Sequence, residues 1–191
     1  YQETLTDPSY HRQVVVQTAP HIGNTGVNDE DPESRRIWVA GYAVRDPARR
    51  PSSWRSVRSL EEELAAQGTV GIAGIDTRAL TRHLRERGAM RVGVSSTGTA
   101  PDALLEKVLE QPEMAGADLV GEVSTTRRYT VDAIGAHRFT VAAIDLGIKR
   151  NTPRRLAARG ITTHVLPVTT SVDDIEADAV FLSNGPGDPA T

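Results

Sequence analysis

The sequence predicts an α+β amino-terminal domain followed by the start of an α/β domain with an open parallel sheet. Two observations support this division. Up to residue 136, strands and helices follow one another irregularly, whereas a regular alternation of strand and helix begins at residue 137. The charge balance changes at the same place, from an acidic excess to equal numbers of basic and acidic residues. We therefore expect residues 129–137 to be the linker between the two domains.

The first part of the sequence contains three short apolar runs typical of strands and three helices with recognisable ends. Ser59 and Glu62 form a capping box at the head of the first helix. Asp76 is expected to cap the second, in which Leu80 and Leu84 share one face. Pro101 stands in the first turn of the third. Strands are predicted over residues 13–18, 37–44 and 69–75, and helices over residues 60–67, 77–87 and from residue 101 onward.

The second part reads as consecutive strand and helix units. Strands are predicted over residues 139–144, 161–166 and 179–182, with a helix between Asn151 and Gly160. Such strands run parallel, and their carboxyl ends form the edge at which open α/β sheets bind ligands. The turns at residues 145–149 and 184–189 lie at that edge. Three strands with one or two helices leave apolar faces uncovered, so we expect only part of this domain to be present.

The composition argues against several classes of function. The 191 residues carry a net charge of −3, which supplies no positive potential for a nucleic acid backbone. No run of about 18 apolar residues is present to span a bilayer. The absence of cysteine excludes disulfides, thiolate metal sites and a cysteine nucleophile within these residues. The five histidines show no metal-ligand spacing, and no Ser/His/Asp set can be assembled.

The turn after the last predicted strand has three interpretations. Gly185, Gly187 and Ala190 match the G-x-G-x-x-G/A fingerprint of dinucleotide sites. Pro186 and Pro189 count against it, because they remove two of the N–H donors that such a loop needs. A tight turn without a ligand is the second interpretation. The third is a site where a small polar ligand approaches the bare backbone.

Two other motifs also have a plain structural interpretation. The turn around Asp145 and Gly147 is similar to the phosphate loop of actin-like ATPases, but a helix is predicted after it where that fold has a hairpin. Lys149 either stays solvated or gives a cationic contact beside the ligand turn. The stretch from Asp7 to Ser9 predicts an ordinary Asx-type turn.

Four stretches together carry a more specific resemblance. They are YQETLTDPSY at residues 1–10, HIGN at 21–24, IDTR at 75–78 with a following Leu-Thr, and FLSNGPGDP at 181–189. In this order and spacing, the whole chain resembles the small subunits of carbamoyl-phosphate synthase. The resemblance implies that residues 1–132 belong to the family's amino-terminal domain, incomplete at its start. It also implies that residues 137–191 are the first part of a flavodoxin-like class I glutamine amidotransferase domain, most of which follows Thr191.

The resemblance implies an enzymatic role for the longer protein. The small subunit hydrolyses L-glutamine to glutamate and ammonia, and the ammonia is channelled to a large subunit in a cytoplasmic heterodimer. The large subunit binds ATP and Mg²⁺ and makes carbamoyl phosphate from bicarbonate for arginine and pyrimidine synthesis. No cofactor is expected in the small subunit. The alternative is that this chain is a non-catalytic binding or assembly module.

The resemblance also assigns roles to individual residues. It implies that Ser9 and the backbones of Gly185 and Gly187 bind L-glutamine, with Lys149 and Asn184 in supporting positions. The family's Cys/His/Glu triad lies beyond Thr191, so a chain of these 191 residues is expected to contain no catalytic residue and to be inactive. We expect Ser9 and the turn at residues 184–188 to face one cleft between the two domains.

Two faces of the first domain are candidates for docking the large subunit. One is the Arg-rich helix at residues 77–87, and the other is the loop at residues 23–36 with its four acidic side chains. The alternative for both is a solvated charged surface.

Overall fold

The computed structural model describes all 191 residues and divides into two compact units, each of which is described by itself. Unit 1 consists of Tyr1–Thr6 and Arg12–Glu113, and unit 2 consists of Asp7–His11 and Met114–Thr191. The division by contacts therefore falls between residues 113 and 114, upstream of the expected linker. The expected linker is itself part of unit 2, because it contains strand β6 (Tyr129–Val131), which pairs with another strand.

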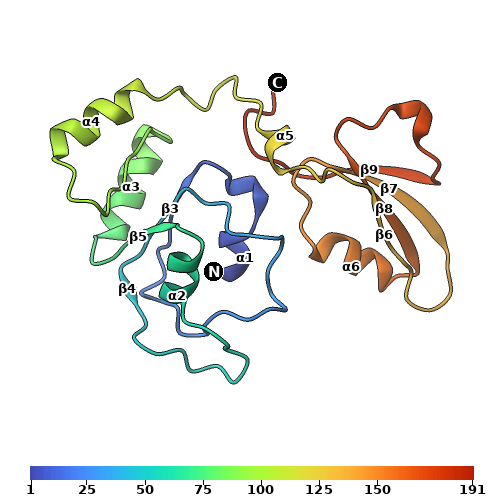
Figure 1. Ribbon diagram of the computed structural model, residues 1–191, viewed down its shortest axis with the longest axis horizontal. Coiled ribbons are helices and arrows are strands. Elements are labelled where there is room, and N and C mark those ends of the chain that lie inside the picture. Colours follow the sequence, from blue (N-terminus) through green and yellow to red (C-terminus); the bar gives the residue numbers. More distant parts are fainter. The chain divides into compact units, whose positions relative to one another are not determined.

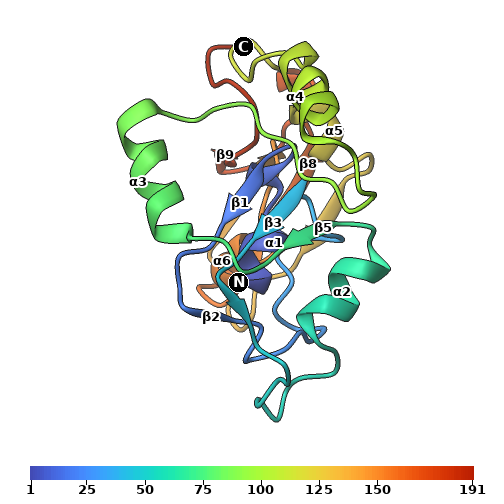
Figure 2. The ribbon, with the colours of Figure 1, turned by 90° about the vertical axis from the view of Figure 1, so that its left-hand side faces the viewer.

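Unit 1 is built around a small parallel sheet in the order β1-β3-β5 (Figure 2). Val14 in β1 is opposite Gly41 in β3, and Gly41 is opposite Val70 in β5. Tyr42 at the centre of the middle strand is 1% exposed, and Leu5 and Val27 are equally buried. The strands of unit 1 are β1 (Val14–Val16), β2 (His21–Ile22), β3 (Gly41–Ala43), β4 (Asp46–Pro47) and β5 (Val70–Ile72), of which β2 and β4 form a separate parallel pair.

Three of the four helices of unit 1 begin where the sequence predicts, and the short helix at Gln2–Leu5 is an addition. The Ser59 Oγ accepts a hydrogen bond from the Glu62 N–H, and the Glu62 carboxylate accepts one from the Ser59 N–H, which confirms the capping box. The Asp76 carboxylate accepts from the Ala79 N–H at 2.9 Å, which confirms the second cap. The helices are α1 (Gln2–Leu5), α2 (Leu60–Ala66), α3 (Thr77–Arg87) and α4 (Pro101–Glu110).

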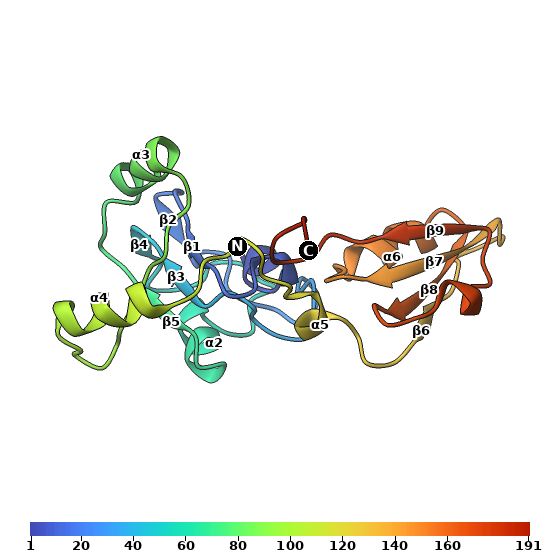
Figure 3. The ribbon, with the colours of Figure 1, turned by 90° about the horizontal axis from the view of Figure 1, so that it is seen from above.

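Unit 2 contains a four-stranded sheet in the order β6-β8-β7-β9 (Figures 1 and 3). The three strands predicted from the sequence, β7 (Phe139–Asp145), β8 (Ile161–Pro167) and β9 (Ala179–Leu182), run parallel to one another. Strand β6 is antiparallel to β8 and closes one edge. Helix α6 (Asn151–Ala157) follows β7 and packs against β8. The remaining elements of unit 2 are α5 (Val120–Val123) and the single-turn 3₁₀ helices η1 (Pro8–Tyr10) and η2 (Val172–Asp174).

The sheet of unit 2 is well packed in its middle strands and open at one edge. Ala143 in β7 and Val165 in β8 are completely buried. Strand β9 is the edge strand on the side opposite β6, and its Val180 and Leu182 are 55% and 66% exposed. Both predicted fold classes are confirmed, and β6 adds to the predicted parallel sheet a strand that the sequence did not predict. No helix in the structure combines the length and the apolar character needed to cross a membrane.

Candidate functional site

The turns that follow β7 and β9 are joined directly to each other. The Ser183 Oγ accepts a hydrogen bond from the Leu146 N–H and donates one to the Asn184 carbonyl, both at 2.9 Å. A Cβ atom built on Gly147 would lie 3.3 Å from the Asn184 carbonyl oxygen and 3.3 Å from the Gly185 Cα. The two strand ends therefore form one continuous polar edge, as expected for a parallel sheet.

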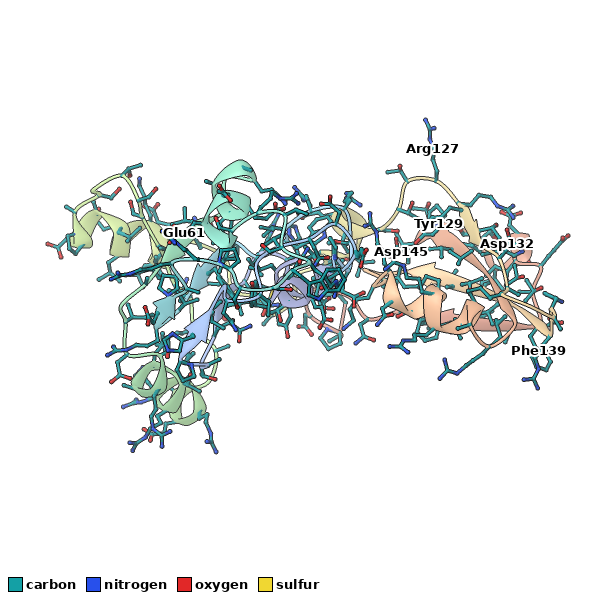
Figure 4. The ribbon with its side chains drawn as sticks, turned by 90° about the horizontal axis from the view of Figure 1, so that it is seen from below. Glu61, Arg127, Tyr129, Asp132, Phe139 and Asp145 are labelled. Atoms are coloured by element: carbon teal, nitrogen blue, oxygen red, sulfur yellow. The ribbon has the colours of Figure 1, made fainter.

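Asp145, the last residue of β7, holds the turn that follows this strand through hydrogen bonds to its carboxylate. One oxygen of its carboxylate accepts hydrogen bonds from the N–H groups of Gly147 (2.9 Å) and Ile148 (2.7 Å), and the other accepts one from Thr125 (2.7 Å). The side chain is buried, and these three donors satisfy it. In Figure 4, Asp145 and Phe139 are labelled at opposite ends of β7. The Asp145 turn can be predicted from the sequence, but the bond to Thr125 cannot, because only the fold brings these residues together.

The segment at residues 7–11, which contains η1, belongs to the same unit as these turns. The Pro8 Cβ lies 3.2 Å from the Cβ position built on Gly147. The Gly185 Cα lies 3.3 Å from the same position. The predicted Asx turn is present, because the Asp7 Oδ1 accepts from the Ser9 N–H at 2.9 Å. Ser9 is therefore held next to the strand ends within unit 2.

One ion pair and one side-chain hydrogen bond hold this segment in place. The Lys149 Nζ lies 3.1 Å from the Asp7 Oδ2, so Lys149 is neither a merely solvated side chain nor an isolated cation. The His11 Nε2 lies 2.7 Å from the Glu122 Oε2 in α5. Neither contact can be predicted from the sequence, because each joins residues more than a hundred positions apart.

Gly185 is positioned so that no side chain could replace its hydrogen. A Cβ atom there would overlap the Leu146 carbonyl oxygen. Gly185 is exposed, and its N–H donates to no group of the chain. Asn184 beside it is also exposed, whereas Pro186 is buried. The turn therefore offers a main-chain donor to a ligand at the carboxyl end of β9.

The far side of the turn is braced by the segment that enters α5. Gly187 forms a β-bridge with Asp118. The Asp188 carboxylate accepts hydrogen bonds from the N–H groups of Gly116 (2.7 Å) and Ala190 (2.9 Å). These bonds, first of all the one from Gly116, lower the pKa of Asp188 below its ordinary value.

The helix that follows the Asp145 turn excludes one interpretation of that turn. The phosphate loop of actin-like ATPases requires a returning hairpin, but α6 begins at Asn151. The edge instead offers the Ser9 segment, a lysine paired with a buried aspartate, and the free N–H of Gly185. These groups suit a small ligand that carries both a negative and a positive charge.

Comparisons with known proteins show the family of the chain. Residues 1–94 match the family model described as carbamoyl-phosphate synthase small chain, CPSase domain, and residues 142–191 match the model for class-I glutamine amidotransferases. The chain is 71% identical over 196 residues to the carbamoyl phosphate synthase small chain of Streptomyces coelicolor, covering all of this chain and 52% of that protein. Identity to the corresponding Mycobacterium tuberculosis and Corynebacterium glutamicum proteins is 62% and 57%, with all of this chain and 54% and 50% of theirs covered.

The parallel sheet of β7, β8 and β9 therefore defines the start of a class-I glutamine amidotransferase domain. The chain as a whole belongs to the family of carbamoyl phosphate synthase small chains. It spans about half the length of the curated relatives that it matches.

Proposed function

We propose that this chain supplies the glutamine-binding edge of a glutamine-hydrolysing small subunit of carbamoyl phosphate synthase. The longer protein would convert L-glutamine to glutamate and ammonia and pass the ammonia to a large chain, which uses bicarbonate and ATP for carbamoyl phosphate. The observation that carries this proposal is the position of the Ser9 segment at the edge formed by β7 and β9. The names of the relatives and the class-I amidotransferase match support it.

The chemistry of the edge fits an α-amino acid. We assign L-glutamine contacts to the Ser9 hydroxyl and to the main chain of Gly185 and Gly187, with Asn184 in support. A hydroxyl and main-chain groups can meet the ammonium and carboxylate of such a ligand in a small volume. Lys149 would act through Asp7, since its Nζ lies 3.1 Å from the carboxylate whose other oxygen holds the Ser9 N–H. We therefore interpret Lys149 as a positioning residue for Ser9.

The nucleophile belongs elsewhere in the longer protein under this proposal. The 191 residues contain no cysteine, so a Cys/His/Glu triad cannot be completed within them. The binding of ATP and Mg²⁺ is assigned to the large chain, and the cytoplasmic location belongs to the same proposal. The residue ranges 1–132 and 137–191 remain our predicted division between the family's two domains.

Steady-state kinetics of the full-length protein with its large chain test the site. Ser9→Ala should raise the KM for glutamine by at least about tenfold with a smaller change in kcat, because a substrate contact is lost while the nucleophile stays. Ser95→Ala is the matched control, since the Ser95 hydroxyl contacts only Thr97 and Thr99 in unit 1. An unchanged KM for Ser9→Ala would remove Ser9 from the site.

The role of Lys149 is tested by a double-mutant cycle with Asp7. Lys149→Met and Asp7→Asn should each raise the KM for glutamine, and the double variant should be little worse than either single variant, because both act through one contact. Fully additive effects would contradict the positioning role. Absence of any glutamine hydrolysis by the unmodified full-length protein would contradict the proposed function itself.

A further inference from the structure

The loop at residues 49–58, which joins β4 to α2, presents the most exposed large apolar side chain of the protein. Trp54 is 93% exposed, and Val57 in the same loop is 61% exposed. The other tryptophan, Trp38, is 3% exposed and donates its indole N–H to the Ser34 Oγ. In Figure 1, this loop extends from the lower part of unit 1 between β4 and α2. We call it the Trp54 loop.

Main-chain hydrogen bonds hold the Trp54 loop on both sides of the indole. The Ser52 N–H and Oγ both donate to the Asn24 carbonyl, at 2.7 and 3.1 Å. The N–H groups of Val57 and Arg58 both donate to the Val27 carbonyl, and the Val27 N–H donates to the Arg58 carbonyl. The loop thus has a defined conformation although its tip is not covered.

Ion pairs add a second set of restraints. The Arg55 guanidinium lies 2.5 Å from the Asp31 carboxylate and 3.0 Å from that of Glu30. The Arg58 guanidinium contacts Asp29 at 3.0 Å and Glu63 at 2.5 Å. Bonds to these carboxylates raise the pKa of both arginines.

The ion pairs give the acidic loop at residues 23–36 a structural role. Three of its four acidic side chains are engaged by Arg55 and Arg58, and the fourth, Glu33, is buried. These carboxylates therefore brace the Trp54 loop.

An exposed tryptophan on a restrained loop has the properties of an interface anchor. Tryptophan buries a large area when it enters a pocket and is enriched among residues that dominate binding energies. Because the loop is already ordered, binding would not require the ordering of a flexible segment. Arg49 and Arg50 precede the indole, are exposed and form no ion pair. The Trp54 loop thus combines an exposed apolar tip with two unpaired cations that precede it in the sequence.

We propose that Trp54 is an anchor for the large chain of the synthase, inserting into an apolar pocket bordered by carboxylates. This inference rests on the proposed function, which supplies the large chain as the partner. The apolar indole fits an apolar pocket on the large chain. The unpaired cations of Arg49 and Arg50 favour carboxylates at the rim of that pocket.

Fluorine NMR tests the contact directly in the full-length small chain. The protein is labelled with 5-fluorotryptophan, and the Trp54 resonance is assigned by its disappearance in Trp54→Phe. On addition of unlabelled large chain, the Trp54 resonance should shift and lose its sensitivity to replacement of H₂O by D₂O, because the indole leaves the solvent. An unchanged Trp54 resonance in a formed complex would overturn the proposal.

Calorimetry measures how much the indole contributes to the affinity. Trp54→Ala should weaken the large chain's binding by at least about tenfold, whereas Trp54→Phe should retain most of the affinity. Val172→Ala is the matched control, since it shortens an apolar side chain that is 81% exposed in unit 2. Equal affinities of Trp54→Ala and the unmodified protein would overturn the anchor while leaving the proposed function intact. If the unmodified protein failed to bind the large chain, both would fall.

The acidic rim is tested by the rate of association. The Arg49→Ser, Arg50→Ser double variant should associate several-fold more slowly at low salt, and the difference should shrink as salt is added. An association rate that is the same for both proteins at every salt concentration would overturn the acidic rim. Sedimentation of the small chain without the large chain tests whether Trp54 instead contacts a second copy of the small chain. Self-association abolished by Trp54→Ala would assign the surface to a second copy and overturn the proposal.

Discussion

At the scale of single residues, Gly185 determines how closely the two strand ends can approach. A methyl group at this position would overlap the Leu146 carbonyl oxygen, which is backbone and cannot rotate away. We expect Gly185→Ala to destabilise the full-length protein by about 1–3 kcal/mol, the usual cost of overpacking, and to raise the KM for glutamine.

Urea unfolding and steady-state kinetics measure the two effects of Gly185→Ala. Gly121→Ala is the control, since a Cβ at Gly121 in α5 meets no atom within 4 Å. It should be neutral or stabilise the protein by up to about 1 kcal/mol, because alanine favours helices. If Gly185→Ala were as stable as Gly121→Ala, the close approach to Leu146 would not constrain the site.

Asp188 makes the shape of the same turn dependent on pH. Its pKa is lowered from the ordinary value of 3.8 by the hydrogen bonds from Gly116 and Ala190. For a carboxyl group with a lowered pKa, the stabilisation is present above the ordinary pKa and is lost as the pH falls through the lowered value. Stability should therefore fall less steeply with pH below about 4 in Asp188→Asn than in the unmodified protein.

The measurement for Asp188 is a series of urea midpoints at decreasing pH, with the Gly116 amide resonance as a local probe. The amide should shift with pH in the unmodified protein and lose that transition in Asp188→Asn. Identical pH profiles would show that the Asp188 bonds do not contribute to the stability of the turn.

At the scale of elements, α3 combines a half-buried apolar side with unpaired cations. Leu80 and Leu84 are half-buried, whereas Arg78, Arg82 and Arg85 are exposed and form no ion pair. Only Thr77 of this helix is fully buried. The Arg-rich face thus remains a candidate for docking the large chain.

Calorimetry with the large chain tests this face of α3. Changing Arg78, Arg82 and Arg85 together to Ser should weaken binding by about tenfold, equivalent to about 1.4 kcal/mol, with an unchanged circular dichroism spectrum. The matched control is the triple change of the exposed Arg127, Arg128 and Arg138 in unit 2 to Ser. Binding within about twofold of the unmodified protein would exclude α3 from the interface.

Strand β6 illustrates what element prediction from sequence misses. Tyr129–Val131 lies within the stretch at residues 129–137 that the sequence predicts to be a linker. Its strand conformation comes from its pairing with β8, in which Tyr129 is opposite Val165. A three-residue edge strand is defined by its neighbour more than by its own propensity. Burial there raises the pKa of the Tyr129 hydroxyl.

At the scale of the whole molecule, binding and catalysis are expected to reside in different parts of the longer protein. A polypeptide limited to these 191 residues contains no cysteine and should release no ammonia from glutamine above background, with or without the large chain. An ammonia assay on a 191-residue polypeptide whose intact mass has been verified tests this prediction. The full-length protein is the positive control. Glutamate production by the 191-residue polypeptide would refute the placement of the nucleophile.

The sequence by itself determined the features of this protein that depend on neighbouring residues. The Ser59 and Glu62 cap, the Asx turn of Asp7 and the three parallel strands follow from spacings of a few residues, and four ordered motifs indicated the family. Only the tertiary structure decided which distant groups meet. Lys149 forms an ion pair with Asp7, which lies 142 positions away. The Asp188 carboxylate accepts a hydrogen bond from Gly116, and Arg55 forms ion pairs with Glu30 and Asp31. The reason is physical: a local hydrogen bond is specified by its own few residues, whereas a long-range ion pair forms only where the folded chain brings its partners together.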